Sequence, residues 1–243
     1  MKLSLSKFAA SKFYGIFNIN SQAVPFIILT RSRTGSSFLV ETLSMHPNII
    51  ARGEVFRKSR IISPSIIMDF IWKRHSRNIR AAGFKIFYYH PNDGENEAIW
   101  TKIAKKKGLK IIHLTRENYL SLAASREFAS HTSSFHNYSQ PGEKTLVSIE
   151  ADIPSAIENL NQAEEFKEKR LDQLENSEMI EVSYEYFTEN YQECMKTIYD
   201  FLGVKAIYSD VKIRSSGIND YRSVIKNYDA LKKSIEDAGY NAD

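Results

Sequence analysis

Residues Phe26–Thr30, FIILT, run directly into the polar segment Arg31–Phe38, RSRTGSSF. The short apolar run predicts a buried strand, and the glycine-containing segment predicts a tight loop that opens a helix over about Ser36–Ser44. Free N–H groups at a helix N-terminus converge on one point, and the helix dipole favours negative charge there. Arg33 adds a planar set of donors suited to phosphate or sulfate oxygens. The segment therefore predicts an anion-binding loop.

Around this loop, short apolar runs alternate with helical stretches. We expect further strands near residues 49–51, 83–89, 109–114 and 179–182. Helical patterns cover the stretch to about Arg80, residues 95–107 and 155–176, a helix with a buried stripe from Phe187 to Phe201, and a terminal helix from about Tyr221. This alternation is typical of an α/β fold with a mostly parallel central sheet flanked by helices. We expect residues 1–243 to form one P-loop-like domain, with an N-terminal extension at 1–24 and a C-terminal tail at 205–243.

The bulk composition narrows the class of protein. The 243 residues are 42% hydrophobic and 26% charged, which is typical of a globular chain. The net charge of +4 suits an anionic ligand, nucleic acid or an acidic membrane face equally well. Cys194 is the single cysteine, so we expect no internal disulfide and a reducing, cytoplasmic compartment. Without a run of about 18 apolar residues, we also expect no transmembrane segment.

The loop differs from the phosphate-binding loop of ATP-dependent enzymes. The sequence contains no Gly-Lys-Ser or Gly-Lys-Thr, so the lysine and the hydroxyl that position a nucleotide-bound magnesium are missing together. This weakens an ATP-dependent interpretation without removing it.

The loop resembles that of a known family. Arg33–Leu39, RTGSSFL, is followed by His46-Pro47-Asn48 and then by Gly53-Glu54. This order resembles the 5′-phosphosulfate loop of PAPS-dependent sulfotransferases, with the bacterial carbohydrate and Nod-factor types closest in pattern. A second segment, Lys110–Ser125, KIIHLTRENYLSLAAS, resembles the family's 3′-phosphate segment. Weaker similarity at residues 182–187, 201–204 and 225–231 extends the resemblance from about residue 25 to 232.

The resemblance implies a transferase that moves a sulfuryl group from PAPS to an acceptor hydroxyl by in-line displacement, without a metal. A carbohydrate or glycolipid is the implied acceptor and partner, and nucleic acid is not. Arg33 would stabilise charge on the leaving 5′-phosphate, and Arg116 with Ser125 would hold the 3′-phosphate. The N–H groups and hydroxyls that would hold the phosphosulfate come from five consecutive residues: Thr34, Gly35, Ser36, Ser37 and Phe38.

Three residues are candidates for the proton transfer. Glu54 is the expected general base, because a glutamate after the same glycine is thought to deprotonate the acceptor in tyrosylprotein-type relatives; otherwise it is a solvated loop carboxylate. Lys85 lies within an apolar strand, where it either reaches the acceptor or sulfate, or occupies an edge with its amine in solvent. His90 follows that strand and is the alternative base.

Two other functions remain open from the sequence. One is a kinase-like, nucleotide-dependent phosphotransferase that uses magnesium. The other is a non-catalytic nucleotide- or RNA-binding protein that uses the basic tail and Lys105–Lys107, a triplet more typical of a solvated helix end. His131 and His136 lie in the polar stretch 131–145, which we expect to be a loop, and their spacing does not indicate a helical metal site.

Overall fold

The strand that precedes the polar loop is the centre of a parallel sheet. The computed structural model describes residues 23–58, 62–73, 75–94, 97–132, 148–207 and 220–243. Within these residues the sheet has five strands in the order β2-β3-β1-β4-β5, and every neighbouring pair is parallel. The strands are β1 Val24–Thr30, β2 Ile49–Glu54, β3 Ala81–Phe87, β4 Lys110–Thr115 and β5 Glu178–Ser183. The predicted fold class, a parallel sheet flanked by helices, is confirmed.

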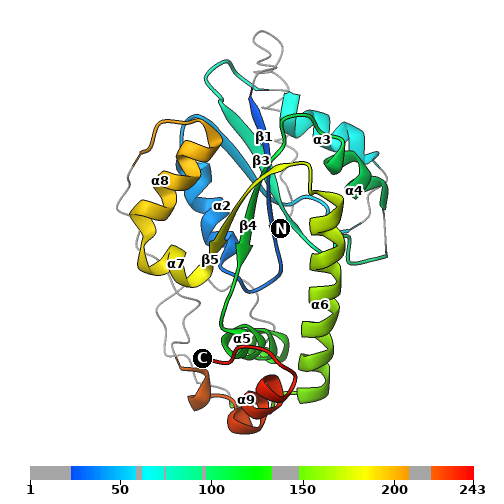
Figure 1. The fold of residues 1–243 in the computed structure, drawn as a ribbon, viewed down its shortest axis with the longest axis vertical. Coiled ribbons are helices and arrows are strands. Elements are labelled where there is room, and N and C mark those ends of the chain that lie inside the picture. The colour runs from blue at the N-terminus through cyan, green and yellow to red at the C-terminus, as the bar shows by residue number, and fades with distance from the viewer. Residues whose placement is uncertain (1–22, 59–61, 74, 95–96, 133–147, 208–219) are drawn as a thin grey trace.

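Helices cover both faces of this sheet (Figure 1). One face packs against α2 Ser36–Met45, α7 Tyr184–Glu189 and α8 Tyr191–Leu202. The other packs against α3 Pro64–Lys73, α4 Glu97–Ala104 and α6 Ile153–Gln173.

The apolar run FIILT fits a strand that helices cover on both faces. Phe26 and Ile28 point into the core under α2 and α8, whereas Ile27 and Leu29 point into the core under α3, α4 and α6. Successive side chains of a strand point to opposite faces, so a strand buried on both faces has no polar alternation. This explains why the sequence of β1 is a continuous apolar run.

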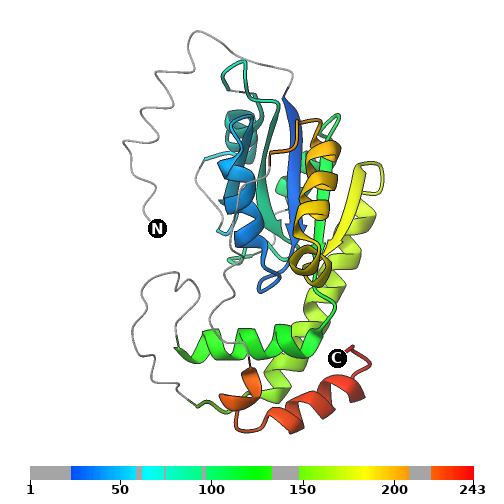
Figure 2. The same cartoon turned by 90° about the vertical axis from the view of Figure 1, so that its left-hand side faces the viewer.

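A third core lies below the carboxyl edge of the sheet. There α5 Tyr119–Thr132 and α9 Tyr228–Asp237 pack against the part of α6 that extends past the strands, as Figures 1 and 2 show. The loop after β1 and the strand ends therefore face α5.

Several expected element boundaries were wrong. Among the described residues of the helical stretch expected to reach Arg80, α3 is the only helix, and the Arg80 N–H already donates to the Asn48 carbonyl (2.8 Å) as the chain enters β3. The helix with the buried stripe is interrupted at Asn190, so Phe187 lies on α7 and the rest of the stripe on α8. The terminal helix begins at Tyr228 after the short 3₁₀ turn Tyr221–Ser223.

Two expected segments fall partly outside the described residues. Of the predicted N-terminal extension, residues 1–22 lie outside, and β1 already begins at Val24. Of the predicted loop 131–145, residues 131 and 132 end α5 and the others lie outside. In the part of the chain that the structure describes, no helix is long and apolar enough to cross a bilayer.

Candidate functional site

The loop between β1 and α2 depends on two left-handed residues. Gly35 precedes α2 with φ 74°, and Arg33 has φ 71°, which is uncommon for a residue with a side chain. A Cβ at Gly35 would lie 2.6 Å from the ring of Tyr184. Glycine is therefore needed at position 35 for both its backbone angle and the closeness of this ring.

Side chains of the loop also tie it to the sheet. The Thr34 hydroxyl lies 2.7 Å from that of Thr30 and donates to the Arg31 carbonyl at 3.0 Å. The Ser32 N–H donates to the Tyr89 hydroxyl at 3.1 Å. These hydrogen bonds fix the loop to residues at the ends of β1 and β3.

Ser36 and Ser37 open helix α2, where the first N–H groups of a helix have no intrahelical acceptor. The Ser36 side chain is buried, and the Ser37 hydroxyl accepts a hydrogen bond from Lys85 Nζ at 3.1 Å. The Phe38 N–H already has an acceptor, because it donates to the Gly35 carbonyl at 3.0 Å. Its ring packs against Phe187, with 5.4 Å between the ring centroids, so Phe38 supports the loop from the core side.

The two segments that the sequence assigned to one nucleotide meet at this loop. Arg33 Nε donates to Ser125 Oγ on α5 at 2.8 Å, and Arg116 Nη1 donates to the Arg33 carbonyl at 2.9 Å. Ser125 is 3% exposed. Residues from the β1–α2 loop, the end of β4 and the middle of α5 therefore form one cluster.

Arg116 has spare hydrogen-bonding capacity in this cluster. Its guanidinium carbon lies 4.7 Å from the centroid of the Tyr184 ring, and its buried Nε finds no hydrogen-bond partner among the described residues. The nearby Glu185 carboxylate is 3.9 Å from that Nε. Burial lowers the pKa of Arg116, but an arginine stays charged at neutral pH. A buried cation with an unused donor suits an anion.

Tyr184 and Glu185 are two residues of the site that sequence reasoning missed. The Tyr184 ring packs close to both Gly35 and Arg116. The Glu185 carboxylate accepts hydrogen bonds from the N–H groups of Glu117 (3.0 Å) and Asn118 (3.3 Å), which fixes the turn after β4. The segment 182–187 was noted for its similarity, but no single-residue signal connected it to the loop.

Glu54, Lys85 and His90 form a second cluster beside the first. Lys85 Nζ lies 3.1 Å from Glu54 Oε1, and Glu54 Oε2 lies 3.6 Å from His90 Nε2. Because Lys85 also contacts Ser37, the second cluster is joined to the loop. The structure thus brings together the residues expected to bind the donor and those expected to move the proton.

Lys85 is not at an edge of the sheet. Strand β3 lies between β2 and β1, and Lys85 is 4% exposed. The alternative of a solvated amine was therefore wrong. Desolvation lowers the pKa of Lys85, and the Glu54 carboxylate opposes that shift.

A register shift in β2 places Glu54. Arg52 pairs with Phe84 and Glu54 pairs with Lys85, so Gly53 is an extra residue in the strand. In a regular strand Glu54 would share the face of Arg52, but the bulge turns it to the face of Lys85 and α2. Glu54 is consequently a strand residue that faces the loop, rather than a residue of a solvated loop.

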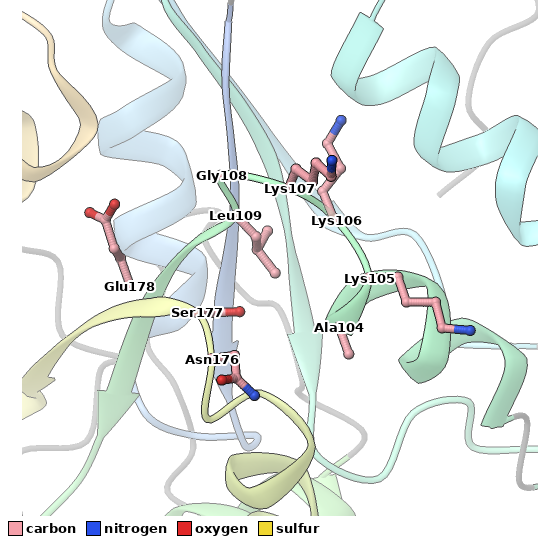
Figure 3. A pocket seen from close by; sticks show the side chains of 9 residues that line it. All are labelled: Ala104, Lys105, Lys106, Lys107, Gly108, Leu109, Asn176, Ser177 and Glu178. Atoms are coloured by element: carbon pink, nitrogen blue, oxygen red, sulfur yellow. The ribbon is translucent and has the colours of Figure 1, made fainter.

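The other basic and histidine positions lie elsewhere. Lys105–Lys107 line a pocket of about 300 Å³ with Gly108, Asn176 and Glu178 (Figure 3). This pocket lies at the amino end of β4, whereas Arg116 follows the carboxyl end. His131 is exposed in the last turn of α5, and His136 lies outside the described residues. In the described ranges there is no group of three or more histidine, cysteine or acidic residues that suits a metal.

Comparisons with solved structures identify the class of this fold. A sulfotransferase from Alicyclobacillus acidocaldarius matches with a TM-score of 0.52 and 15% identity over 88% of this chain and 91% of that one. A mouse sulfotransferase complexed with PAP matches with a TM-score of 0.51 and 13% identity over 93% of this chain and 88% of that one. No family model matches the sequence. The fold is that of the sulfotransferases.

Curated relatives make the assignment more particular. Nodulation protein H from Rhizobium tropici is 25% identical over 194 residues, covering 75% of this chain and 76% of the relative. Nodulation protein H from Rhizobium meliloti is 24% identical over 196 residues, covering 75% and 78%. The chain is thus a homologue of these proteins, and the resemblance seen in the sequence is confirmed. The comparisons support a sulfotransferase enzyme.

Proposed function

We propose that this chain is a PAPS-dependent sulfotransferase that transfers the sulfuryl group to a hydroxyl of a carbohydrate or glycolipid. The contact of Arg33 with both Ser125 and Arg116 is the main support, because it joins the two segments that would hold opposite ends of one nucleotide. The PAP complex of a structural neighbour supports the donor. The relatives named Nodulation protein H support the carbohydrate-type acceptor.

The proposed donor site uses the whole first cluster. The N–H groups of residues 34–37 and the Arg33 guanidinium would hold the 5′-phosphosulfate at the N-terminus of α2. Arg116 and Ser125 would hold the 3′-phosphate, which would satisfy the buried Arg116 Nε. The Thr34 hydroxyl is already engaged with Thr30, so its contribution would come from the backbone.

The proposed chemistry is an in-line displacement with a loose transition state, where positioning and charge stabilisation supply most of the catalysis. The acceptor hydroxyl gives its proton to the Glu54 carboxylate while its oxygen forms a bond to sulfur. The bond from sulfur to the 5′-phosphate oxygen breaks, and PAP leaves with the bonding electron pair. Arg33 stabilises charge on that oxygen, and Lys85 lies where it contacts both the base and Ser37. The cationic side chains would do this work without a metal.

The domain organisation and the cellular location of the enzyme are also proposals. We infer one domain across the chain and a cytoplasmic location, which the single cysteine supports. Cys194 is buried on α8, and burial raises the pKa of its thiol to about 12, so the thiol is unreactive near neutral pH.

Two measurements test the proposed function. In the first, PAP and ATP are titrated by calorimetry with and without magnesium, and we expect PAP to bind tightly without the metal. In the second, PAPS is incubated with an oligosaccharide, a glycolipid and a simple alcohol, and mass spectrometry detects an added sulfate. A preference for ATP with magnesium would favour a phosphotransferase. Salt-sensitive RNA binding without PAP binding would favour a non-catalytic protein.

A further inference from the structure

His90 has a fixed place at the end of β3. Its side chain is buried, and Trp100 Nε1 donates to its carbonyl oxygen at 3.0 Å. Its ring packs against the ring of Phe87, with 4.7 Å between the centroids. The backbone at His90 is therefore bound to α4, and the imidazole packs on Phe87.

The hydrogen bonds of His90 determine which nitrogen carries the proton. The backbone N–H of Phe87 donates to His90 Nδ1 at 3.2 Å, so Nδ1 is an acceptor without a proton. A neutral imidazole has one donor and one acceptor nitrogen, so Nε2 carries the proton. Nε2 finds no other hydrogen-bond partner among the described residues and lies 3.6 Å from Glu54 Oε2.

The Glu54 carboxylate thus lies between two donors, with Lys85 at Oε1 and His90 at Oε2. A nitrogen that carries a proton cannot accept one. To act as the base, His90 would have to move its proton to Nδ1, where it would oppose the N–H of Phe87. This conflict makes the alternative of a histidine base unfavourable in this fold.

We propose that His90 is a positioning residue that orients the Glu54 carboxylate towards the acceptor, and that it does not itself take the proton. The proposal rests on the proposed function, in which Glu54 is the base. The contact of 3.6 Å is longer than a hydrogen bond, and catalytic contacts of this kind often tighten only when substrates bind. His90 would thereby restrict the carboxylate to one rotamer.

The charges around the ring agree with this role. Glu54 faces it from β2, Lys85 from β3, and Arg57 lies nearby in the segment after β2. Burial, followed by the positive charges of Lys85 and Arg57, lowers the pKa of His90 to about 3. The ring therefore stays neutral at the pH where a sulfotransferase would work.

Matched substitutions separate the two roles. His90→Gln keeps a donor near the position of Nε2, whereas His90→Asn keeps an acceptor for Phe87 and loses that donor. With PAPS and an oligosaccharide acceptor, we expect Glu54→Gln to lower kcat by about 10²- to 10⁴-fold. We expect His90→Gln to lower it by less than about tenfold and His90→Asn by clearly more, both with an unchanged KM for PAPS. His131→Gln, in an exposed turn, is the control and should leave kcat unchanged.

The outcomes distinguish the inference from the function on which it rests. If Glu54→Gln keeps full turnover, the proposed base is wrong whatever His90 does. If Glu54→Gln is inactive and His90→Gln loses as much as Glu54→Gln, His90 takes the proton and the inference fails. An equal loss of kcat in His90→Gln and His90→Asn would also overturn the inference, because the loss would then not depend on a hydrogen-bond donor near the position of Nε2.

A spectroscopic measurement on the unmodified chain needs no active variant. With ¹⁵N-labelled histidine, NMR reports which ring nitrogen carries the proton. We expect His90 to be neutral and protonated at Nε2 throughout pH 5 to 8. A proton on Nδ1, or a charged ring at pH 6, would overturn the inference even if both His90 variants failed to fold.

Discussion

The β1–α2 loop and the Glu54–Lys85–His90 cluster lie side by side and are built in different ways. The loop is continuous in sequence, and its shape depends on two left-handed residues, Arg33 and Gly35. The cluster is assembled from β2, β3 and the turn after β3, and it depends on strand register and a bulge. A contiguous binding loop can be recognised in a sequence, whereas a cluster of this second kind requires the sheet order.

The two regions also differ in charge. In the loop region, Arg33 and Arg116 donate hydrogen bonds to uncharged oxygens, and Arg116 Nε, 3.9 Å from the Glu185 carboxylate, has no hydrogen-bond partner among the described residues. In the second cluster, Lys85 is already paired with Glu54. The first region therefore suits an incoming anion, and the second suits proton transfer to a carboxylate held by its neighbours.

The largest effect should come from Glu54→Gln. Loss of the proposed base should lower kcat by about 10²- to 10⁴-fold, since general-base catalysis typically contributes that much. PAP affinity, measured by calorimetry, should stay within about twofold, because the donor residues are untouched. Glu178→Gln, at the far edge of the sheet, is the matched control and should leave both quantities unchanged. A parallel loss of PAP affinity in Glu54→Gln would break the division between the two regions.

The next largest effect should come from Arg33→Ala and Arg116→Ala. Each removes a charge-assisted contact worth about 1.5–3 kcal/mol, so each should weaken PAP binding by roughly 10- to 100-fold. Lys105→Ala removes an equal charge at the opposite edge, beside the pocket in Figure 3, and calorimetry should show little change. Equal losses in all three variants would mean that PAP responds to net charge rather than to the loop.

A third prediction separates backbone strain from steric overlap. Gly35 and Gly203 have similar left-handed angles, φ 74° and 70°, but a Cβ would overlap the Tyr184 ring only at Gly35. Gly203→Ala should lower the free energy of unfolding by about 1–2 kcal/mol from backbone strain. Gly35→Ala should lower it by about 1–3 kcal/mol more, because the ring must move, and it should also weaken PAP binding. Urea unfolding measures the first quantity and calorimetry the second; equal destabilisation would argue against the packing of Tyr184 on the loop.

The smallest effect concerns pH and stability. The pKa of His90 is about 3 in the folded chain, against about 6.5 when the chain is unfolded, so between these values only the unfolded chain binds the proton. The free energy of unfolding should therefore fall as the pH is lowered, by about 1 kcal/mol from this residue between pH 6.5 and 5.5. Burial of His113 also lowers its pKa and adds a slope of the same sign.

His90→Gln removes the titrating ring, so its stability should fall less steeply over this range than that of the unmodified chain. Thermal unfolding at several pH values provides the comparison, and identical slopes for the two proteins would contradict the neutral, buried state of His90.

The sequence predicted the regions that local patterns determine. The run FIILT and the glycine after it were sufficient for the buried strand, the loop and helix α2. The side of the sheet that Glu54 faces was not predictable, because it depends on the bulge between Arg52 and Glu54. The position of Lys85 was ambiguous for a related reason: an apolar strand indicates burial, but only the strand order shows that β3 has neighbours on both sides.

The features that the sequence did not predict depend largely on contacts between distant segments. Tyr184 contacts Gly35 and Arg116 from a segment distant in sequence, after β5, and no pattern at Tyr184 itself indicates that contact. The break between α7 and α8 was hidden because the apolar spacing continues across Asn190. Apolar periodicity shows which face is buried and does not show where a helix stops.

The central claim is that one nucleotide spans the Gly35 loop and Arg116, and a crystal structure with PAP tests it most directly. We expect the 5′-phosphate on the N–H groups at the start of α2 and the 3′-phosphate on Arg116 and Ser125. PAP bound elsewhere with this loop vacant, or a 3′-phosphate that does not contact Arg116, would contradict the account.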